Sequence, residues 1–320
     1  MIDKKLTSSL HTIIQNEYGN TEGIVILEDG NLAFEEYFGN SNCNSKIHIA
    51  SVTKSILSAL IGIAIENGYI KSEEETVMGY FPEYTSISPN NVREKITIRN
   101  LLTMTAPYSF SDWNEPLEAL CTSHDWIEFA LQEMGQNGKI GVFKYSTAGA
   151  HLLSAILTRV SGKSAREFAN EFLFTQIGID KIKEYPMSSY GYDDLFGEKV
   201  RGWVHDPNNI TTGGWGLTLT VREMARFGQL YLDNGFWNGK QIIPQDWIAK
   251  STMPNLNHYG YMWWLFENDG LNAFAAMGDG GNSICCVPRK NLVVAIASHF
   301  IPNPKDRWLL VKDYILPAIR

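Results

Sequence analysis

One segment, SVTKSILSALIGIAIENG at residues 51–68, constrains the fold of this 320-residue chain more than any other. From Ile56 to Ile65 it is apolar on nearly every side of a helix, so other elements must surround it. The apolar stretch is about half the length needed to cross a bilayer. We therefore expect a central, buried helix that begins near Ser51.

Predicted strands gather near both ends of the chain, and predicted helices fill the middle. Two β-rich runs flank Asp29-Gly30, which is a strong hairpin signal. Residues from 272 onward form a pattern of three strands, with a turn at Pro288 to Asn291. Helical spacing predicts helices at residues 3–18, 123–134, 148–160, 221–235 and 305–319.

This order predicts an α/β (α+β) fold, in which one antiparallel sheet is assembled from both termini and flanked by helices. We expect a discontinuous sheet domain at residues 1–75 and 205–320 and a mostly helical domain at 76–204. No flexible linker separates them, so we expect a shared interface, with the active site in the cleft between them.

The charge balance narrows the class of partner. The chain carries 35 acidic and 27 basic residues, for a formal net charge of -8, and no long run of like charge. This favours a small-molecule or short peptide-like substrate over nucleic acid or an anionic membrane. The oligomeric state stays open. An apolar stretch of signal-peptide length does not follow the N-terminal charges, so we expect a cytoplasmic protein.

The sequence patterns give no support to a metal or a cofactor. The four cysteines lack CxxC spacing, and Cys285 and Cys286 would point to opposite faces of a strand, so free thiols are expected. The seven histidines show no HExxH spacing, and no glycine-rich nucleotide loop occurs.

Ser51 and Lys54 allow two interpretations. Serine commonly caps a helix, and Ser-x-x-Lys is expected about once by chance in a chain of this length. Alternatively, Ser51 is a nucleophile and Lys54 is its base, since residues i and i+3 share one face of a helix. The helix dipole alone would not lower the pKa of a lysine enough to leave it neutral and able to accept a proton near pH 7, so burial and a second group must contribute. Tyr145, just before a predicted helix, is the candidate.

Six segments in order resemble the serine β-lactamase and penicillin-binding-protein superfamily. The likeness is to its class C-like branch of family VIII esterases, D-aminopeptidases and 6-aminohexanoate-dimer hydrolases. The segments are ASVTKSILSALIGIAIENGYI, ITIRNLLTMT, FKYSTAGAHLLSAIL, GGWGLTLTVREMARFGQLYLDNGFWNGKQIIPQDWI, YGYMWWL and MGDGGNSICCVPRKNLVVAIAS. The resemblance implies that Ser51 is the nucleophile, Lys54 its base and Tyr145 the tyrosine of the second motif.

The same resemblance assigns the third motif to Asp279, Gly280 and Gly281, and the oxyanion hole to the N–H groups of Ser51 and Asn282. The two glycines would let a substrate approach the strand edge. A fixed pair of N–H donors stabilises a tetrahedral oxyanion by several kcal/mol.

Two residues depart from the family pattern. Thr147 stands where the second motif usually has asparagine, and Asp279 replaces a cationic or neutral residue that attracts a substrate carboxylate. A carboxylate would repel such a substrate, so we expect neutral or amine-bearing esters and small amides. The aromatic residues expected to line the pocket are Trp113, Trp215, Tyr259 and Trp263.

The sequence thus predicts a serine hydrolase that acts through an acyl-enzyme on an ester, a small amide or an aminohexanoate-like oligomer. A class C-type β-lactamase or DD-peptidase is the alternative within enzymes. A non-catalytic acyl-binding or penicillin-sensing module is the alternative of another class.

Overall fold

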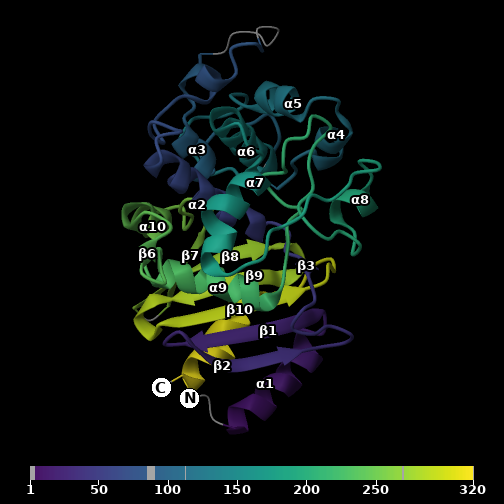
Figure 1. Ribbon diagram of the computed structural model, residues 1–320, viewed down its shortest axis with the longest axis vertical. Coiled ribbons are helices and arrows are strands. Elements are labelled where there is room, and N and C mark those ends of the chain that lie inside the picture. The colour runs from purple at the N-terminus through teal and green to yellow at the C-terminus, as the bar shows by residue number, and fades with distance from the viewer. Residues whose placement is uncertain (1–3, 85–90, 112, 269, 320) are drawn as a thin grey trace.

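The computed structural model describes residues 4–84, 91–111, 113–268 and 270–319. Its main feature is a six-stranded antiparallel sheet in the order β2-β1-β10-β9-β8-β7 (Figure 1). The strands are β1 (Thr21–Glu28), β2 (Asn31–Tyr37), β7 (Trp264–Asn268), β8 (Leu271–Gly278), β9 (Asn282–Val287) and β10 (Leu292–Ser298). The prediction of one antiparallel sheet built from both ends of the chain is therefore confirmed.

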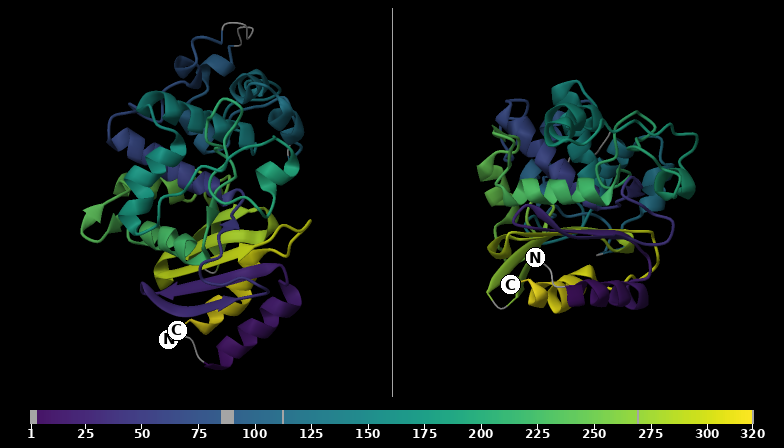
Figure 2. Two further views of the ribbon diagram at one scale, coloured as in Figure 1. Left: turned by 45° about the vertical axis from the view of Figure 1, so that its right-hand side comes forward. Right: turned by 60° about the horizontal axis from the view of Figure 1, so that its bottom comes forward.

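Helices cover both faces of this sheet (Figure 2). On one face lie α1 (Lys4–Glu17) and the C-terminal helix α11 (Arg307–Leu310). On the other lie α9 (Val221–Leu232) and the central helix α2 (Val52–Glu66). Strand alternation sorts the two cores, because Cys285 packs on the α1 side and Cys286 on the α9 side.

The predicted hairpin turn at Asp29-Gly30 and the predicted C-terminal helix are both present. Asp29 and Gly30 both have positive φ, 50° and 72°, as the tight turn of a two-residue hairpin requires. The C-terminal helix is less regular than expected, since α11 passes into a π-helical turn at Val311–Ile315 and a 3₁₀ turn at Leu316–Ala318. Residue 3 of the predicted first helix lies outside the described residues.

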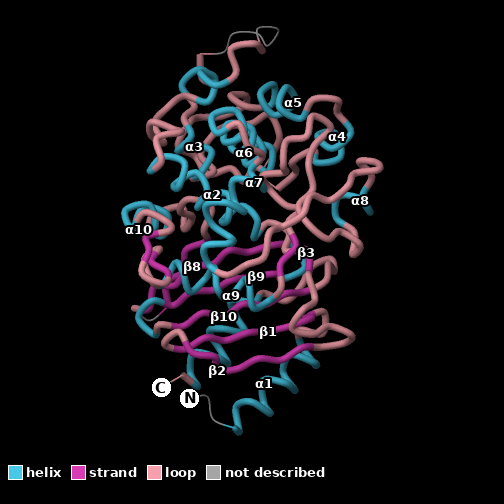
Figure 3. Tube along the Cα trace, in the orientation of Figure 1, coloured by secondary structure: helices cyan, strands magenta, loops and turns pink. Residues whose placement is uncertain are grey.

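The middle of the chain forms short helices joined by long loops above the sheet (Figure 3). Asp125 accepts hydrogen bonds from the N–H groups of Ile127 and Glu128, which explains why the predicted helix at 123–134 begins only at Trp126. The helices here are α3 (Ile98–Leu102), α4 (Leu117–Thr122), α5 (Trp126–Glu133), α6 (Thr147–Ser161), α7 (Ala165–Ala169), α8 (Tyr192–Phe196) and α10 (Gln245–Thr252).

One hydrophobic cluster runs from these helices through α2 to the near face of the sheet. Ile156 of α6, Leu60 of α2 and Val293 of β10 all belong to it. The helical region and the sheet therefore share a core, and the domain boundaries at 75/76 and 204/205 stay a prediction. No helix among the described residues is both long and apolar enough to cross a membrane.

The sequence did not predict β7 or the two pairs of two-residue strands. β7 has five residues and pairs with β8, with Trp264 opposite Ala275. β3 (Ile47–His48) immediately precedes α2 in the chain and pairs with β4 (Thr218–Leu219). β5 (Phe236–Trp237) pairs with β6 (Lys240–Gln241). Two-residue strands carry too little alternation to be read from a sequence.

His48 of β3 ties the entry of α2 to a glycine-rich loop. The N–H of Gly216 donates to His48 Nε2 over 3.0 Å. Burial lowers the pKa of His48 to about 4, so its ring is neutral at pH 7 and keeps an acceptor nitrogen. This loop also carries Gly214, whose carbonyl oxygen contacts the central helix.

We predict that Gly228→Ala destabilises the protein, although alanine normally favours a helix. A Cβ at residue 228 in α9 would lie 2.6 Å from Val293 Cγ1 and 2.7 Å from Ile284 Cγ2. Overpacking costs about 1–3 kcal/mol, against a gain of about 1 kcal/mol in helix propensity. Urea unfolding should show a net loss, whereas Asn16→Ala on the exposed side of α1 should change little. Equal stability of the two variants would contradict this packing.

We also predict that His48 makes stability fall in mild acid. Its folded pKa lies below its unfolded value, so neutral His48 stabilises the fold fully above pH 6.5, and this contribution is lost as the pH falls towards 4. Within this window the free energy of unfolding should drop by up to about 1.4 kcal/mol per pH unit.

Glutamine keeps an acceptor but does not titrate, so His48→Gln should flatten this pH dependence between pH 6.5 and 4. The control is His124→Gln, at an exposed histidine. Urea unfolding at several pH values measures both. A His48→Gln variant with the wild-type slope would refute the assignment.

Candidate active site

Ser51 lies at the first turn of α2, directly after a strained residue. Ala50 has φ of 48°, in the left-handed region, which costs an L-residue roughly 1–2 kcal/mol. This bend turns the chain from β3 into the helix. The Ser51 side chain makes no capping hydrogen bond, although the residue occupies the N-cap position. Its hydroxyl is therefore left available for another partner.

That partner is Lys54, one helical turn further on. Lys54 Nζ lies 3.0 Å from Ser51 Oγ and 3.0 Å from the carbonyl oxygen of Gly214. The side chain is 1% exposed, and no ion pair of Lys54 with an acidic residue occurs in the part of the chain that is described. The Gly214 carbonyl takes one N–H of the amine and fixes its direction. The nitrogen is thus held where it can exchange a proton with the hydroxyl.

Tyr145 completes this group through its ring. Lys54 Nζ lies 4.8 Å from the ring centroid, so the described contact is a cation–π arrangement. Tyr145 immediately precedes Ser146, whose hydroxyl accepts from the N–H of Gly149 and caps α6. The structure thus brings together Ser51, Lys54 and Tyr145, which lie 94 residues apart at most in the sequence.

Aromatic side chains surround Tyr145, and we call this group the aromatic cluster: Trp113, Phe143, Tyr145, Tyr259 and Trp264. Trp113 stacks on Tyr145 with centroids 5.3 Å apart, and Trp264 does so at 6.0 Å. Trp113 is 68% exposed, so most of its surface remains open to a bound molecule. Tyr259 is buried edge-on against Tyr145, and this burial raises its pKa well above 10.

Trp264 was missed by sequence reasoning, which named its neighbour Trp263. Trp263 is fully buried against Phe227, Tyr231 and Phe274, on the core side. Trp264 begins β7 and therefore points the other way, towards Tyr145. Only the alternation of side chains along the strand separates these two residues, and no strand was predicted here from the sequence.

Trp215 lies in a different environment from the aromatic cluster. It is 3% exposed and stacks between Trp126 and Phe196, with centroids 5.6 Å and 5.4 Å away. Neighbouring aromatic side chains bury Trp215, because α5 and α8 each supply a ring to this stack.

Thr147 is held at the start of α6 by Glu115, a residue that sequence reasoning also missed. Glu115 accepts from the N–H groups of Thr147 and Ala148, over 2.6 and 2.7 Å, and from the Ser146 hydroxyl. A carboxylate at this end of a helix is favoured by the macrodipole. A Cβ on Gly214 would lie 2.5 Å from Thr147 Cγ2 and 3.2 Å from Lys54 Nζ, so these residues meet at Gly214.

The end of β8 lies over Ser51. A Cβ on Gly278 would lie 2.5 Å from the Ile49 oxygen and 2.9 Å from the Ser51 nitrogen, so only glycine fits here. Among the described residues, no hydrogen bond occupies the N–H of Ser51. Asp279 follows Gly278 and is exposed. The strand end therefore faces the same space as the free N–H of Ser51.

The other residues of the third motif have different neighbours. At Gly280 and Gly281 an added Cβ would meet His299, Phe300 and Arg307 rather than Ser51. Asn282 starts β9, which lies between β8 and β10, and its side chain is bonded to the Asp279 oxygen and the Ser298 N–H.

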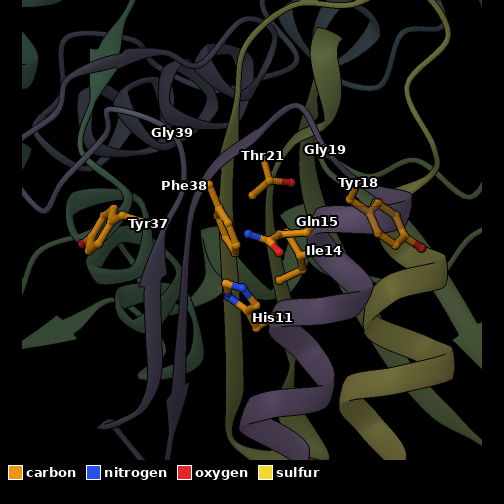
Figure 4. A pocket seen from close by; sticks show the side chains of 9 residues that line it. All are labelled: His11, Ile14, Gln15, Tyr18, Gly19, Thr21, Tyr37, Phe38 and Gly39. Carbon is orange, nitrogen blue, oxygen red and sulfur yellow. The ribbon is translucent and has the colours of Figure 1, made fainter.

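A cavity of about 390 Å³ lies between α1 and β2, and none of the predicted site residues lines it. Its lining includes His11, Gln15 and Phe38 (Figure 4). No group of three or more possible metal ligands occurs within the described ranges.

The chain is similar to known proteins over most of its length. The family model described as Beta-lactamase matches residues 18–309 of this chain. The 6-aminohexanoate-dimer hydrolase of Paenarthrobacter ureafaciens is 22% identical over 328 residues, which cover 92% of this chain and 77% of the relative.

Two solved structures have the same fold. A class C beta-lactamase superposes with a TM-score of 0.73 at 13% identity, covering 99% of this chain and 96% of its own. A family VIII carboxylesterase superposes with a TM-score of 0.68 at 16% identity, covering 100% and 98%. The match of the family model to residues 18–309 shows that the chain belongs to the Beta-lactamase family.

Proposed function

We propose that this protein is a serine hydrolase that forms an acyl-enzyme on uncharged or amine-bearing esters and small amides. The superfamily to which it belongs consists of serine hydrolases. The observation that carries the proposal is the 3.0 Å contact between Lys54 Nζ and Ser51 Oγ at the start of a buried helix. A helix cap alone would not need a buried amine beside an uncapped hydroxyl.

In the proposed first step, Lys54 takes the proton of the Ser51 hydroxyl while Oγ bonds to the substrate carbonyl carbon. Lys54 is preferred over Tyr145 as the base because its nitrogen contacts Oγ. The tetrahedral intermediate then expels the alcohol or amine, which receives a proton through Tyr145. In the second step, water attacks the carbonyl carbon of the Ser51 ester with Lys54 again as the base, and the acid is released.

Two N–H donors would stabilise the oxyanion. The first is Ser51, whose N–H is free of partners in the described structure. For the second we prefer Asp279 to Asn282, because β8 extends past its last β7 pair at Ala275 and so leaves its end open towards Ser51. Asn282 lies inside the sheet, where strand N–H groups pair with neighbouring strands.

The surroundings of Ser51 support the proposed substrate class. The aromatic cluster offers flat apolar surface for an acyl chain or a leaving group, and a ring face also attracts an ammonium group. Asp279 adds negative charge beside the strand end. A 6-aminohexanoate-type amide has the required apolar chain and amine, whereas penicillins carry a carboxylate.

We predict that Ser51→Ala lowers the rate of p-nitrophenyl butyrate hydrolysis at least about 1000-fold, because it removes the nucleophile. The matched control is Ser58→Ala, on the same buried helix, where the hydroxyl has no hydrogen-bond partner. The control should keep the wild-type rate. Both variants are measured by release of p-nitrophenol. An unchanged rate in Ser51→Ala would end the proposal.

We further predict that Asp279→Asn favours anionic substrates. An exposed like-charge contact at 4 Å costs about 1 kcal/mol in water, which corresponds to roughly a fivefold change. The kcat/KM of a carboxylate-bearing ester should therefore rise about fivefold relative to that of its neutral methyl ester.

Asp313→Asn provides the control for this change, because it removes the same charge from an exposed position on the C-terminal helical segment. In Asp313→Asn, the kcat/KM of the carboxylate-bearing ester relative to that of its methyl ester should stay at the wild-type value. The effect of Asp279→Asn should shrink at high salt. Equal ratios in both variants would mean that Asp279 does not face the substrate.

A further inference from the structure

The turn Asp279–Gly281, which follows the strand end at Ser51, is held by side chains at each of its carbonyl groups. Such bonding of successive carbonyls leaves a turn little freedom to move. The donors are Asn282 to the oxygen of Asp279 (2.8 Å), Asn20 to that of Gly280 (2.6 Å) and the Ser298 hydroxyl to that of Gly281 (3.5 Å).

Among these donors, Asn20 has a side chain that hydrogen-bonds three different residues. It lies between α1 and β1 and is 5% exposed. Its amide nitrogen also donates to the His299 oxygen over 2.7 Å, and its amide oxygen accepts from Arg307 over 2.6 Å. The orientation of the Asn20 side-chain amide is therefore defined, because its nitrogen faces two carbonyl oxygens and its oxygen faces a cation.

Arg307 is a buried cation, only 2% exposed. Burial lowers its pKa to about 10, which still leaves it protonated at pH 7. Within the described residues it forms no ion pair. It donates instead to Asn20, to the hydroxyls of Ser298 and Thr21 and to the Lys305 oxygen, and its guanidinium carbon lies 5.0 Å from the Tyr18 ring centroid. A buried charge without a carboxylate is costly, so its place against this turn calls for a reason.

The two glycines of the turn match this arrangement. Gly280 and Gly281 have φ of 78° and 90°, which side chains rarely adopt. A Cβ on Gly281 would lie 2.7 Å from the Arg307 guanidinium carbon, and one on Gly280 would lie 2.9 Å from the His299 oxygen. Both glycines thus permit the approach of the groups that hold the turn.

We propose that Asn20 and Arg307 are positioning residues for the oxyanion hole: together they fix the turn that sets the end of β8 against Ser51. This inference rests on the proposed function. Neither side chain touches the substrate. Arg307 orients the Asn20 amide, Asn20 holds the Gly280 carbonyl, and the turn holds the strand end at Gly278 and Asp279.

The test is Asn20→Asp, which keeps the shape of the side chain and its acceptor for Arg307 but replaces the donor to Gly280 and His299. Misplacement of the strand end should lower the kcat for p-nitrophenyl butyrate about 10- to 100-fold with little change in KM. A boronic acid, which binds Ser51 as a tetrahedral adduct, should lose affinity by a similar factor. Arg307→Lys removes the planar guanidinium that donates to the Asn20 oxygen through one nitrogen and to the Lys305 oxygen through another, so it should show the same pattern more weakly.

Asn170→Ala is the matched control. Asn170 is also a buried asparagine whose side chain hydrogen-bonds main-chain groups, here the N–H and the oxygen of Ile182, and neither bond involves Ser51 or the turn Asp279–Gly281. It should lose stability yet keep its kcat and boronic acid affinity. Thermal unfolding and circular dichroism establish that each variant is folded. If Asn20→Asp does not fold, Arg307→Lys carries the test alone.

The outcomes separate this inference from the proposed function. If the wild type shows no hydrolysis that depends on Ser51, the proposed function fails. If hydrolysis depends on Ser51 but the folded Asn20 and Arg307 variants match Asn170→Ala in kcat and boronic acid affinity, only the positioning role is overturned. A parallel loss of kcat and boronic acid affinity, with KM unchanged, supports it.

Discussion

The contact between Lys54 and Ser51 depends on a helix that the protein surrounds completely. Residues 52–64 of α2 are all buried, so the start of this helix cannot move without disturbing the shared core. The left-handed Ala50 turns the chain into the helix, and the Gly214 carbonyl oxygen accepts a hydrogen bond from Lys54 Nζ. Rigidity at this one point gives a hydroxyl and an amine a fixed separation, which is what efficient proton transfer requires.

Three separate parts of the fold meet at this helix start. The glycine-rich loop is tied by His48 and carries Gly214, the start of α6 is held by Glu115 and carries Tyr145, and the sheet supplies the end of β8. Each part is anchored by polar groups that lie outside the reacting atoms. Since buried polar groups are costly when unpaired, these anchors commit each segment to one arrangement.

The sequence predicted the parts of the site that local spacing encodes. Ser51 and Lys54 share a helix, and the turn at Asp29-Gly30 follows from its own two residues. The assembly of the sheet from both termini could be predicted because strand and helix patterns were strong there. Tyr145 required the family resemblance, since no local pattern connects it to Ser51.

The remaining features depend on contacts between distant residues or on strand parity. Glu115 is 32 residues from Thr147, and Asn20 is 287 residues from Arg307, so no window of sequence contains either pair. Trp263 and Trp264 are adjacent and chemically identical, and only the unpredicted strand β7 decides that Trp264 meets Tyr145. Gly280 and Gly281 were read as access for a substrate, whereas their neighbours are His299, Phe300 and Arg307.

Covalent labelling can reveal whether Ser51 is an activated nucleophile. The protein is incubated with a fluorophosphonate, digested with trypsin and analysed by mass spectrometry, with fragment ions of the peptide IHIASVTK distinguishing Ser51 from Thr53. We expect one adduct per chain, located on Ser51 and absent from protein denatured before the reaction. An unlabelled Ser51, or an adduct confined to another residue, would contradict it.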